Sequence, residues 1–417
     1  MKKLLTGLLL TALCLQLFGC AVQEHAPNET NGGVTEAMTE QNETNGGVTE
    51  AVTEQKEEIA ARNAAADFAL ALLQKCENGR DNCILSPYSI LTALAMAENG
   101  ADGETLRQFE SVLGMPAGTL NAYLQGCFAA EGQEVVSANS VWLREEDGFA
   151  LKEEFCEITQ ELFGAECFTA PFDAQTVEQV NAWVSDQTKQ RIDRIVESLD
   201  DASMVLINAL SFDAEWERKY TAADVRNGAF TAADGTVQEV KMLCGRENAY
   251  LDDGMATGFI KPYVGGKYSF VALLPNEGTD MQTYLSDLTG SKLLATIQGA
   301  SDEQVTVKMP KLKTETTLKL SEQLEMLGLT NAFSGAADFS RMATENQHID
   351  EVIHKTYLKI DEEGTEAAAA TAVLMTKSAR PERNGRSVTL DRPYVMAIVD
   401  HETDCLLFLG VVNGISE

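Results

Sequence analysis

Histidine is scarce in this chain of 417 residues, which has four: His25, His348, His354 and His401. The sequence also lacks a Gly-x-Ser-x-Gly elbow, a His-Glu-x-x-His pair, a P-loop and a Gly-x-Gly-x-x-Gly turn. Those motifs carry the nucleophile, the metal ligands or the phosphate cradle of several large enzyme classes. We therefore expect that the protein is not an enzyme and that it uses no metal and no other cofactor.

Basic residues are few as well. The 32 Lys and Arg stand against 64 Asp and Glu, and the formal net charge is -32 at pH 7. Nucleic-acid binding depends on clustered Lys and Arg that neutralise phosphates. The composition therefore argues against a nucleic-acid partner. A strongly negative surface keeps a protein soluble and can steer it toward basic partners at low salt.

The N-terminus lacks an apolar run long enough for a comfortable transmembrane helix. The run from Leu4 to Phe18 follows two lysines and has the length of a secretory signal. It ends in Leu-Phe-Gly-Cys, which resembles a bacterial lipoprotein cleavage box with Cys20 as the lipidated residue. We expect a signal peptide over residues 1–19 and a protein exported and anchored through Cys20 to the outer face of the bacterial cell membrane. An ordinary signal peptide and an extracellular protein are the alternative.

Residues 20–56 contain no aromatic side chain and are dominated by Gly, Thr, Asn and Glu. Residues 28–41 read NETNGGVTEAMTEQ, and residues 42–55 repeat them with Val52 in place of Met38. Two polar copies are too few to build a solenoid. A segment of this composition cannot bury a core, so we expect an acidic, disordered spacer.

The folded domain is expected over residues 57–417. Apolar residues make up 44% of the chain, which is ample for one large core. Helical periodicity is expected from residue 57 and over residues 89–97, 151–162, 177–191 and 319–327. Strand patterns cover residues 135–143, 204–212, 268–274, 305–309, 357–360, 395–399 and 405–412. Because the helices concentrate early and the strands late, we expect an α+β fold.

The most informative segment is residues 359–376, which read KIDEEGTEAAAATAVLMT. From this segment up to Pro393, about 27 residues show no helix or strand pattern of their own. Such a stretch is far longer than most connections in a compact domain. At strand spacing, one face of the segment carries small, uncharged or apolar side chains. Those residues are Thr365, Ala367, Ala369, Thr371, Val373 and Met375. A loop with this pattern can join a sheet as an extra strand.

This segment resembles the hinge and reactive loop of the serpins, and the likeness extends from about residue 58 to the C-terminus. The other matching pieces are 82–90 (NCILSPYSI), 205–216 (VLINALSFDAEW), 273–278 (LLPNEG), 309–312 (MPKL), 324–333, 352–355 (VIHK), 391–394 (DRPY) and 408–413 (FLGVVN). The pieces occur in one colinear order. The resemblance implies three β-sheets, eight or nine helices and an exposed reactive-centre loop.

The resemblance also implies a function. Serpins inhibit proteases by strand insertion and release of stored strain. We therefore expect a monomeric, irreversible suicide-substrate inhibitor of serine proteases, in which insertion of the cleaved loop into the central sheet traps the acyl-enzyme. A serpin-fold binding module on the cell surface that never inserts its loop is the alternative. A solute-binding lipoprotein is a third hypothesis.

By the same resemblance, individual residues receive roles. The hinge comprises Glu362, Gly364, Thr365, Glu366, Ala367, Ala368, Ala369 and Ala370. Counting from the hinge glycine places the reactive bond at Ser378-Ala379, with Lys377, Thr376 and Met375 as alternatives because this loop is about four residues longer than in common relatives. Elastase- and subtilisin-like proteases would accept most of these residues, and a trypsin-like protease would accept Lys377. Sheet opening is assigned to Ser86, Ser89, Asn208 and His354.

Cysteine usage gives a weaker signal. Beyond Cys14 and Cys20 there are seven cysteines, an odd number with no Cys-x-x-Cys spacing. The seven are Cys76, Cys83, Cys127, Cys156, Cys167, Cys244 and Cys405. At least one of them must stay unpaired within the chain. We expect buried free thiols that act as small hydrophobes, and Cys76 with Cys83 is the sequence-close pair to test.

Overall fold

The computed structural model describes residues 37–130, 132–146, 149–199, 202–345, 347–365 and 385–415, with side chains from residue 55 onward. The chain divides into two units, Met1–Thr53 and Glu54–Glu417. The packing described below is that of the second unit. Glu366 to Ala370 of the hinge, the reactive-bond candidates from Met375 to Ala379, and Cys20 lie outside the described residues.

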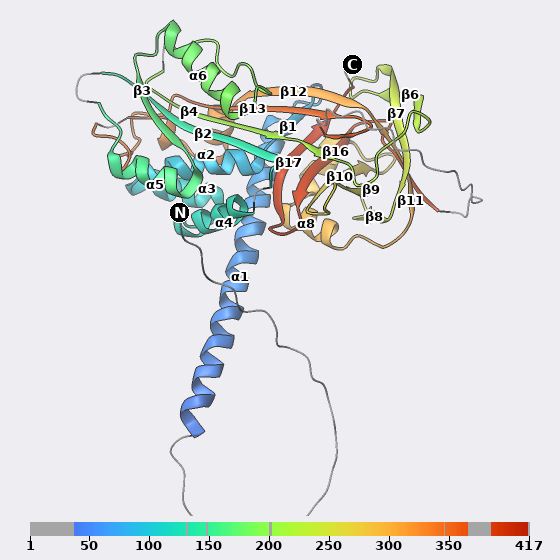
Figure 1. Ribbon diagram of the computed structural model, residues 1–417, viewed down its shortest axis with the longest axis horizontal. Helices are drawn as coiled ribbons and strands as arrows, with labels where there is room; N and C mark the ends of the chain where they lie inside the picture. The colour runs from blue at the N-terminus through green and yellow to red at the C-terminus, as the bar shows by residue number, and fades with distance from the viewer. Residues whose placement is uncertain are drawn as a thin grey trace, which may run out of the picture. The chain divides into compact units, whose positions relative to one another are not determined.

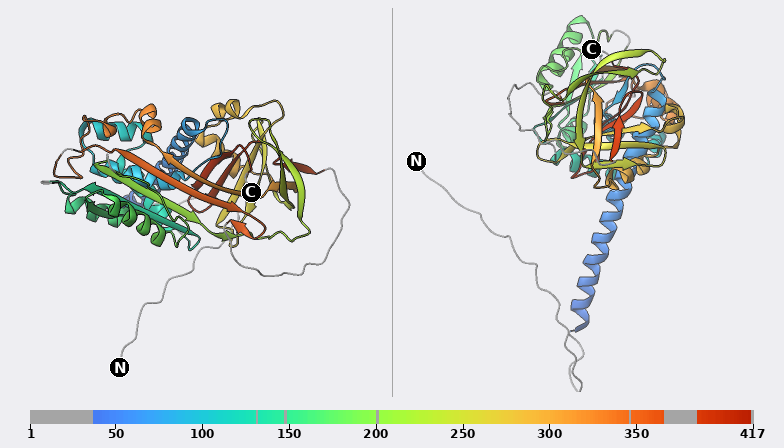
Figure 2. Two further views of the ribbon diagram at one scale, coloured as in Figure 1. Left: turned by 90° about the horizontal axis from the view of Figure 1, so that it is seen from above. Right: turned by 90° about the vertical axis from the view of Figure 1, so that its right-hand side faces the viewer.

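A seven-stranded sheet dominates the second unit. Its strands are β3 (Glu166–Ala170), β2 (Val135–Arg144), β4 (Met204–Phe212), β13 (Glu351–Ile360), β14 (Gly364–Thr365), β5 (Ala214–Glu215) and β12 (Leu312–Lys319), which pairs with β13. The sheet is mixed, because β4 pairs antiparallel to β2 but parallel to β13. Figure 2 shows these long strands from above, side by side.

Two further sheets complete the strand content of the described residues. The six-stranded sheet has the order β1 (Cys83–Leu85), β17 (Cys405–Val412), β16 (Tyr394–Asp400), β10 (Tyr268–Pro275), β9 (Ala256–Pro262), β8 (Ala249–Asp252). The four-stranded sheet has the order β15 (Arg386–Thr389), β11 (Val305–Pro310), β7 (Val237–Glu247), β6 (Val225–Thr231). Every residue of β10, β16 and β17 is buried, which explains why these strands read as continuous apolar runs instead of alternating ones.

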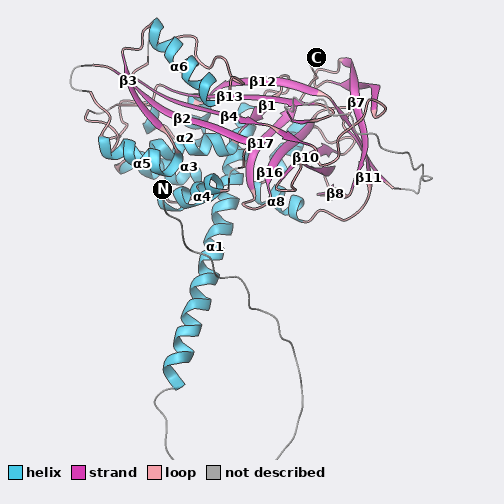
Figure 3. Cartoon of the chain, in the orientation of Figure 1, coloured by secondary structure: helices cyan, strands magenta, loops and turns pink. Residues whose placement is uncertain are grey.

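Nine α-helices lie within the described residues. They are α1 (Ala37–Cys76), α2 (Pro87–Gly100), α3 (Gly103–Leu113), α4 (Ala117–Ala129), α5 (Glu153–Phe163), α6 (Ala174–Gln187), α7 (Met281–Asp287), α8 (Gly290–Gln298) and α9 (Ser321–Leu327). In Figure 1, α6 lies on one face of the seven-stranded sheet and α2 to α5 lie on the other. Figure 3 shows the same arrangement coloured by secondary structure, with helices on both sides of the long strands. The predicted α+β fold, with three sheets and eight or nine helices, is confirmed.

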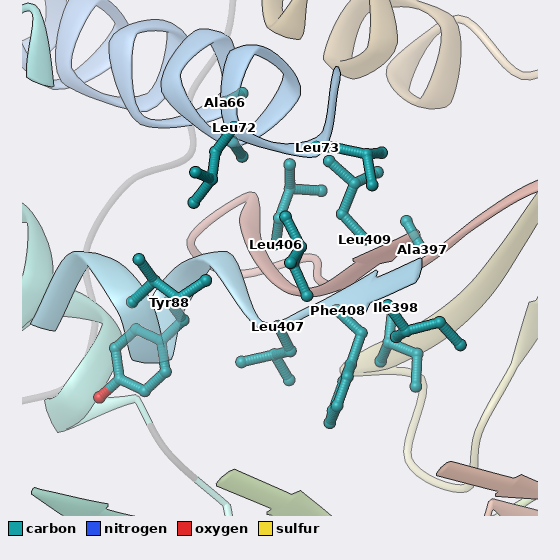
Figure 4. Close-up of a cluster of buried hydrophobic side chains, with 14 of the residues drawn as sticks. Ala66, Leu72, Leu73, Tyr88, Ala397, Ile398, Leu406, Leu407, Phe408 and Leu409 are labelled. Carbon is teal, nitrogen blue, oxygen red and sulfur yellow. The ribbon is translucent and has the colours of Figure 1, made fainter. Parts of the chain in front are cut away.

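Alternation along β4 explains how both faces of this sheet are covered. Val205, Ile207 and Ala209 belong to a smaller apolar cluster with Val180 and Val184 of α6. The intervening residues of β4 face the main core, in which α1, α2 and the six-stranded sheet meet. In Figure 4, Leu72 and Leu73 of α1 lie close to Leu406 and Leu409 of β17. The central strands are therefore buried on both faces.

Helix α1 begins earlier than the sequence suggests. It starts at Ala37, inside the spacer for which disorder was expected, and the boundary expected at residue 57 falls within it. Among the side chains that the structure describes in this helix, residues 55–60 are exposed and burial in the core begins at Ala61. Because extending a helix costs far less than nucleating one, the packed turns after Ala61 account for the exposed helical turn at residues 55–60.

Candidate functional site

The candidate site is a seam in the seven-stranded sheet, which we define as the boundary between Val205–Leu210 of β4 and Glu351–Thr356 of β13. These two strands are parallel neighbours, with Glu351 opposite Val205 and Thr356 opposite Leu210. Within the described residues their direct pairing ends there, although β13 continues to Ile360. Parallel pairs are slightly less stable per residue than antiparallel ones. Among the described residues, the only other parallel pairing in this sheet is that of β2 with β3.

Strand β14 occupies the end of this seam. After Ile360 the chain turns through residues 361–363, and the Asp361 amide donates to the Gly364 carbonyl at 3.0 Å. Thr365 then pairs antiparallel with Ile360 on one side and with Ala214 of β5 on the other. Gly364 and Thr365, two residues of the predicted hinge, therefore form a short strand between β13 and β5, and β5 follows directly after β4 in the chain.

Glycine is required at position 364 because the backbone of β5 lies so close to it, and not because of its own backbone dihedral angles. A Cβ atom at this position would lie 2.1 Å from the Ala214 carbonyl oxygen and 2.8 Å from the Glu215 Cα. Both are backbone atoms held by strand pairing, so neither can move aside like a flexible side chain. Any other residue at position 364 would push β14 away from β5.

Thr365 faces inward and is fully paired. It is 1% exposed, and its hydroxyl lies 2.6 Å from the Tyr263 hydroxyl. Tyr263 is itself fully buried and stacks on Trp216 at a centroid distance of 4.4 Å. Burial raises the pKa of Tyr263 well above its usual range, so its hydroxyl stays neutral. A small polar side chain at position 365 satisfies a buried tyrosine without introducing a charge.

Trp216 holds the turn that leads into β14. Its indole Nε1 donates to the Asp361 carbonyl at 2.9 Å, and its backbone amide donates to the Glu363 carbonyl at 2.8 Å. The tryptophan was noted in the sequence only as part of the resemblance, whereas Tyr263 was missed. No local pattern marks Tyr263, because its partners Trp216 and Thr365 are distant in sequence and meet only in the fold.

The acidic residues of the turn are paired at the surface. Glu362 lies 2.5 Å from the Lys311 ammonium, and Glu363 lies 2.8 Å from that of Lys219. Lys219 also contacts Glu215 of β5 at 2.7 Å, so one lysine joins the turn to the neighbouring strand. Hydrogen bonds to Glu215 and Glu363 raise the pKa of Lys219, which stays charged. These ion pairs hold the turn at residues 361–363 against neighbouring strands at the protein surface.

His354 lies near the middle of the seam. Its Nε2 accepts a hydrogen bond from the Ser86 amide at 3.0 Å, so Nε2 carries no proton. The ring is 1% exposed, and burial lowers its pKa from 6.5 to about 3. The imidazole is therefore neutral at physiological pH and joins β13 to the start of α2. This contact is structural and includes none of the partners that acid–base catalysis would need.

The other residues assigned to sheet opening lie around His354. Asn208 is opposite it in the register, and the Asn208 side-chain amide donates to Asn139 of β2. The Ser89 amide donates to Ser86 Oγ at 3.3 Å. The structure thus brings all four predicted residues together and adds Asn139, which sequence reasoning missed. No hydrogen-bond partner is found among the described residues for Ser89 Oγ, Asn208 Oδ1 or His354 Nδ1.

The chain returns from the loop at a different sheet. Residues 386–389 form β15, which pairs parallel with β11, Val305 lying opposite Arg386. β15 is the first strand in the order of the four-stranded sheet and so lies at its edge, and Arg386 contacts Glu303 at 3.2 Å. The segment from Thr365 to Arg386 therefore links the interior of one sheet to the edge of another.

Other kinds of site were sought in the same residues. The described residues contain no group of three or more His, Cys, Asp or Glu side chains placed to hold a metal ion. None of the described helices combines the length and apolarity that a membrane crossing needs.

The described residues thus form three sheets, and the two-residue strand β14 lies at the end of the seam between β13 and β5. The family model for serpins, described as serine protease inhibitors, matches residues 63–414. This chain belongs to the serpin family.

Individual relatives agree with this assignment. An uncharacterized serpin-like protein of Thermococcus kodakarensis is 32% identical over 419 residues, which cover 97% of each chain. The native-state crystal structure of the thermophilic serpin tengpin has a TM-score of 0.80 and 38% identity, covering 85% of this chain and 94% of tengpin. The latent-state structure of tengpin has a TM-score of 0.72 and 35% identity, covering 85% of this chain and 98% of tengpin. This chain is thus more similar to the native state.

Proposed function

We propose that this serpin is an irreversible suicide-substrate inhibitor of serine proteases. In the proposed mechanism, a protease attacks the loop between Thr365 and Arg386 and forms an acyl-enzyme. Once the bond is cut, the part that begins at Gly364 is tethered at one end only and extends β14 into the seam. The attached protease is carried along and distorted before deacylation can release it.

The observation that carries the proposal is the position of β14. A strand inserted along the whole seam would be antiparallel to both β13 and β4, and β14 already has this orientation at one end. Extension would replace one parallel pairing by two antiparallel ones, and would satisfy backbone groups of the inserted loop. Both changes favour the inserted state.

The inward orientation of Thr365 also determines which residues of the inserted strand would face the core. Because Thr365 faces the core, residues 367, 369, 371, 373 and 375 would face it too after insertion. Those residues are Ala, Ala, Thr, Val and Met, so the buried face would carry no charge. A loop that never inserts has no need of this pattern, and the pattern therefore favours inhibition over a serpin-fold binding module.

The target and the location belong to the same proposal. The reactive bond is placed at Ser378-Ala379, with Lys377, Thr376 and Met375 as alternative residues before the cut. Elastase-, subtilisin- or trypsin-like proteases are the proposed partners. Export and lipidation at Cys20 would place the inhibitor at the outer face of the cell membrane, where it would meet proteases from outside the cell.

The test mixes the full chain with elastase, subtilisin and trypsin separately and resolves the products on denaturing gels. We expect a band that survives boiling at the summed size of inhibitor and protease, and a released C-terminal peptide whose mass identifies the bond. A protease whose catalytic serine is already blocked is the matched control and should give no such band. Clean cleavage without the band for every protease would contradict the proposal and favour a non-inhibitory binding module.

A further inference from the structure

Residues 216–220, which follow β5 in the chain and which we name the hinge clamp, bind the hinge turn at residues 361–363. The carbonyl oxygens of all three turn residues accept hydrogen bonds from this segment. Two of the donors are the indole and the backbone amide of Trp216. The third is the backbone amide of Tyr220, which donates to the Glu362 carbonyl at 3.0 Å. The position of the turn therefore depends on the conformation of the hinge clamp.

The hinge clamp has little regular structure of its own. Trp216 makes an isolated bridge with Tyr263, and residues 217–220 belong to no helix or strand. A segment without a continuous ladder of hydrogen bonds opens more readily than a strand. Side-chain contacts must therefore hold the hinge clamp in the conformation that binds the turn.

Lys261 of β9 supplies such contacts. Its ammonium donates to the Arg218 carbonyl at 3.0 Å. The same ammonium lies 5.0 Å from the ring centre of Trp216 and 4.5 Å from that of Tyr220. Both distances are within the range of cation–π attraction. One side chain thus contacts the beginning, the middle and the end of the hinge clamp.

A buried carboxylate holds the Lys261 ammonium in place. Glu247 of β7 accepts a hydrogen bond from it at 2.9 Å, and the side chains of Lys261 and Glu247 are 1% and 6% exposed. Burial lowers the pKa of Lys261 and raises that of Glu247, and the ion pair opposes both shifts. A buried ion pair adds little net stability over apolar side chains of similar volume. Stability alone therefore does not explain the presence of this pair.

We propose that Lys261 is a positioning residue for the hinge. Its ammonium, held by Glu247, keeps the hinge clamp in the conformation that binds the turn at residues 361–363, and β14 consequently stays in register between β13 and β5. Without the ammonium, the donors of Trp216 and Tyr220 lose their alignment with the turn. The effect on inhibition rests on the proposed function, because a displaced β14 would delay insertion and give deacylation more time to release the protease.

Hydrogen–deuterium exchange of the full chain, measured without a protease, tests the positioning role. The backbone amides of Trp216 and Tyr220 donate to the turn, so their exchange reports how often the hinge clamp releases it. In Lys261→Met, peptides that cover residues 214–221 should exchange roughly tenfold faster or more, the effect of losing one hydrogen bond to a charged group. Unchanged exchange would overturn the proposal.

A double variant separates positioning from stability. Lys261→Met alone leaves the Glu247 carboxylate buried without its partner, which lowers stability. Combining Lys261→Met with Glu247→Leu removes both buried charges, so the Tm should return toward that of the parent chain. Exchange in residues 214–221 should nevertheless stay fast. If slow exchange returned together with the Tm, Lys261 would only stabilise the fold, and the proposal would be wrong.

Lys267→Met is the matched control. Lys267 also combines an ion pair, 3.3 Å from Asp400, with a ring contact, 5.5 Å from the ring centre of Tyr268. These partners belong to β16 and β10 and not to the hinge clamp. The control should leave exchange in residues 214–221 unchanged. Equally fast exchange in this variant would mean that the measurement reports a general loss of stability, and it would overturn the proposal.

The effect on inhibition is measured with a protease that gives a boiling-resistant complex with the parent chain. The double variant should be cleaved at the parent rate, because its loop is unchanged, while the yield of complex should fall roughly threefold and cleaved chain should accumulate instead. Faster exchange with an undiminished yield of complex would overturn the link between the hinge clamp and insertion. A parent chain that forms no complex would contradict the proposed inhibitor function, and the exchange results would still decide whether Lys261 positions the hinge.

Discussion

The two ends of the seam differ in a way that indicates how the sheet would open. At the hinge end, a third strand already lies between β13 and β5, and Thr365 and Tyr263 satisfy each other's hydroxyl groups. At the histidine end, which we define by His354, Asn208 and Ser86, β4 and β13 still pair directly. Several buried polar atoms there have no partner among the described residues. The strand β14 therefore lies between its neighbours at the hinge end, whereas β4 and β13 pair directly at the histidine end, where buried polar atoms lack partners among the described residues.

This difference favours opening in one direction. Unpaired buried polar atoms cost free energy, so the histidine end has less to lose when β4 and β13 part. At the hinge end β14 already lies between β13 and β5, and in the proposed mechanism it would stabilise the first residues of the incoming strand. We infer that insertion would propagate from Thr365 toward His354, with each added residue pairing on both sides.

The largest expected effect comes from a charge placed on the inward face of the inserting loop. Ala369→Glu would require burial of a carboxylate during insertion, which costs several kcal/mol. The protein should then be cleaved as a substrate, and the yield of the boiling-resistant complex should fall roughly tenfold or more. Gel densitometry at equal amounts of protease and inhibitor measures the yield.

Ala368→Glu is the matched control, because the neighbouring position would lie on the opposite face of the sheet after insertion and point away from the main core. It adds the same charge and side chain one residue away. Equal loss of complex in both variants would mean that the alternation set by Thr365 does not continue into the loop.

The histidine end should be sensitive to acid. His354 has a pKa of about 3 in the folded protein, against 6.5 for the unfolded chain. Between these values the unfolded chain binds one more proton, so stability is fully present above pH 6.5 and declines as pH falls. The loss should reach about 3 kcal/mol at pH 4.5 from this group alone.

His354→Gln replaces the titrating ring with an amide whose oxygen can still accept the Ser86 amide hydrogen. The pH dependence of Tm should become shallower between pH 6.5 and 4.5 in this variant. His401→Gln is the comparison, because His401 is exposed. If His354→Gln keeps the full acid sensitivity of the parent, His354 is not its source.

The hinge end is expected to depend on a neutral hydrogen bond. Tyr263→Phe removes the hydroxyl that pairs with Thr365 and leaves a buried hydroxyl unsatisfied, at a cost of about 1–2 kcal/mol. Tyr394→Phe is a sharp control, since the buried Tyr394 hydroxyl has no partner among the described residues. Thermal unfolding at a fixed scan rate should show a lower Tm for the first variant and no loss for the second. A reversed order would contradict the assigned role of Tyr263.

The hinge was predicted from a local pattern, namely Gly364 and the small residues after it. His354, Asn208, Ser86 and Ser89 were assigned to sheet opening through resemblance to a family and not through periodicity, and the structure places these four residues close together. Tyr263 and Asn139 were missed, because their roles depend on strands that meet only in the folded sheet. Distances between such partners are set by register, which a single sequence specifies weakly.

The helices and strands show the same contrast between what a local pattern predicts and what only the fold determines. Strands β10, β16 and β17 of the six-stranded sheet were predicted because burial on both faces gives continuous apolar runs, whereas β1, β8 and β9 were not predicted. Helix α3 was missed, although Asp102 caps its first turn and Phe109 and Leu113 are spaced one turn apart. Helix α4 carries Gly118 and Gly126, which weaken any helical prediction. Packing against α2 and α5 overrides that preference, and no local signal reports it.

The smallest expected effect concerns the surface pairs of the turn. Lys219 joins Glu363 to Glu215, but all three side chains are between one-quarter and one-half exposed. Such pairs contribute roughly 0.2–1 kcal/mol and are screened by salt. Lys219→Met should therefore lower Tm slightly at low ionic strength and not measurably at high ionic strength. Arg107→Met, which breaks the more exposed pair with Glu104 on α3, should have still less effect at either. A loss at Lys219 that persists in high salt would mean that its aliphatic chain, and not its charge, supports the hinge.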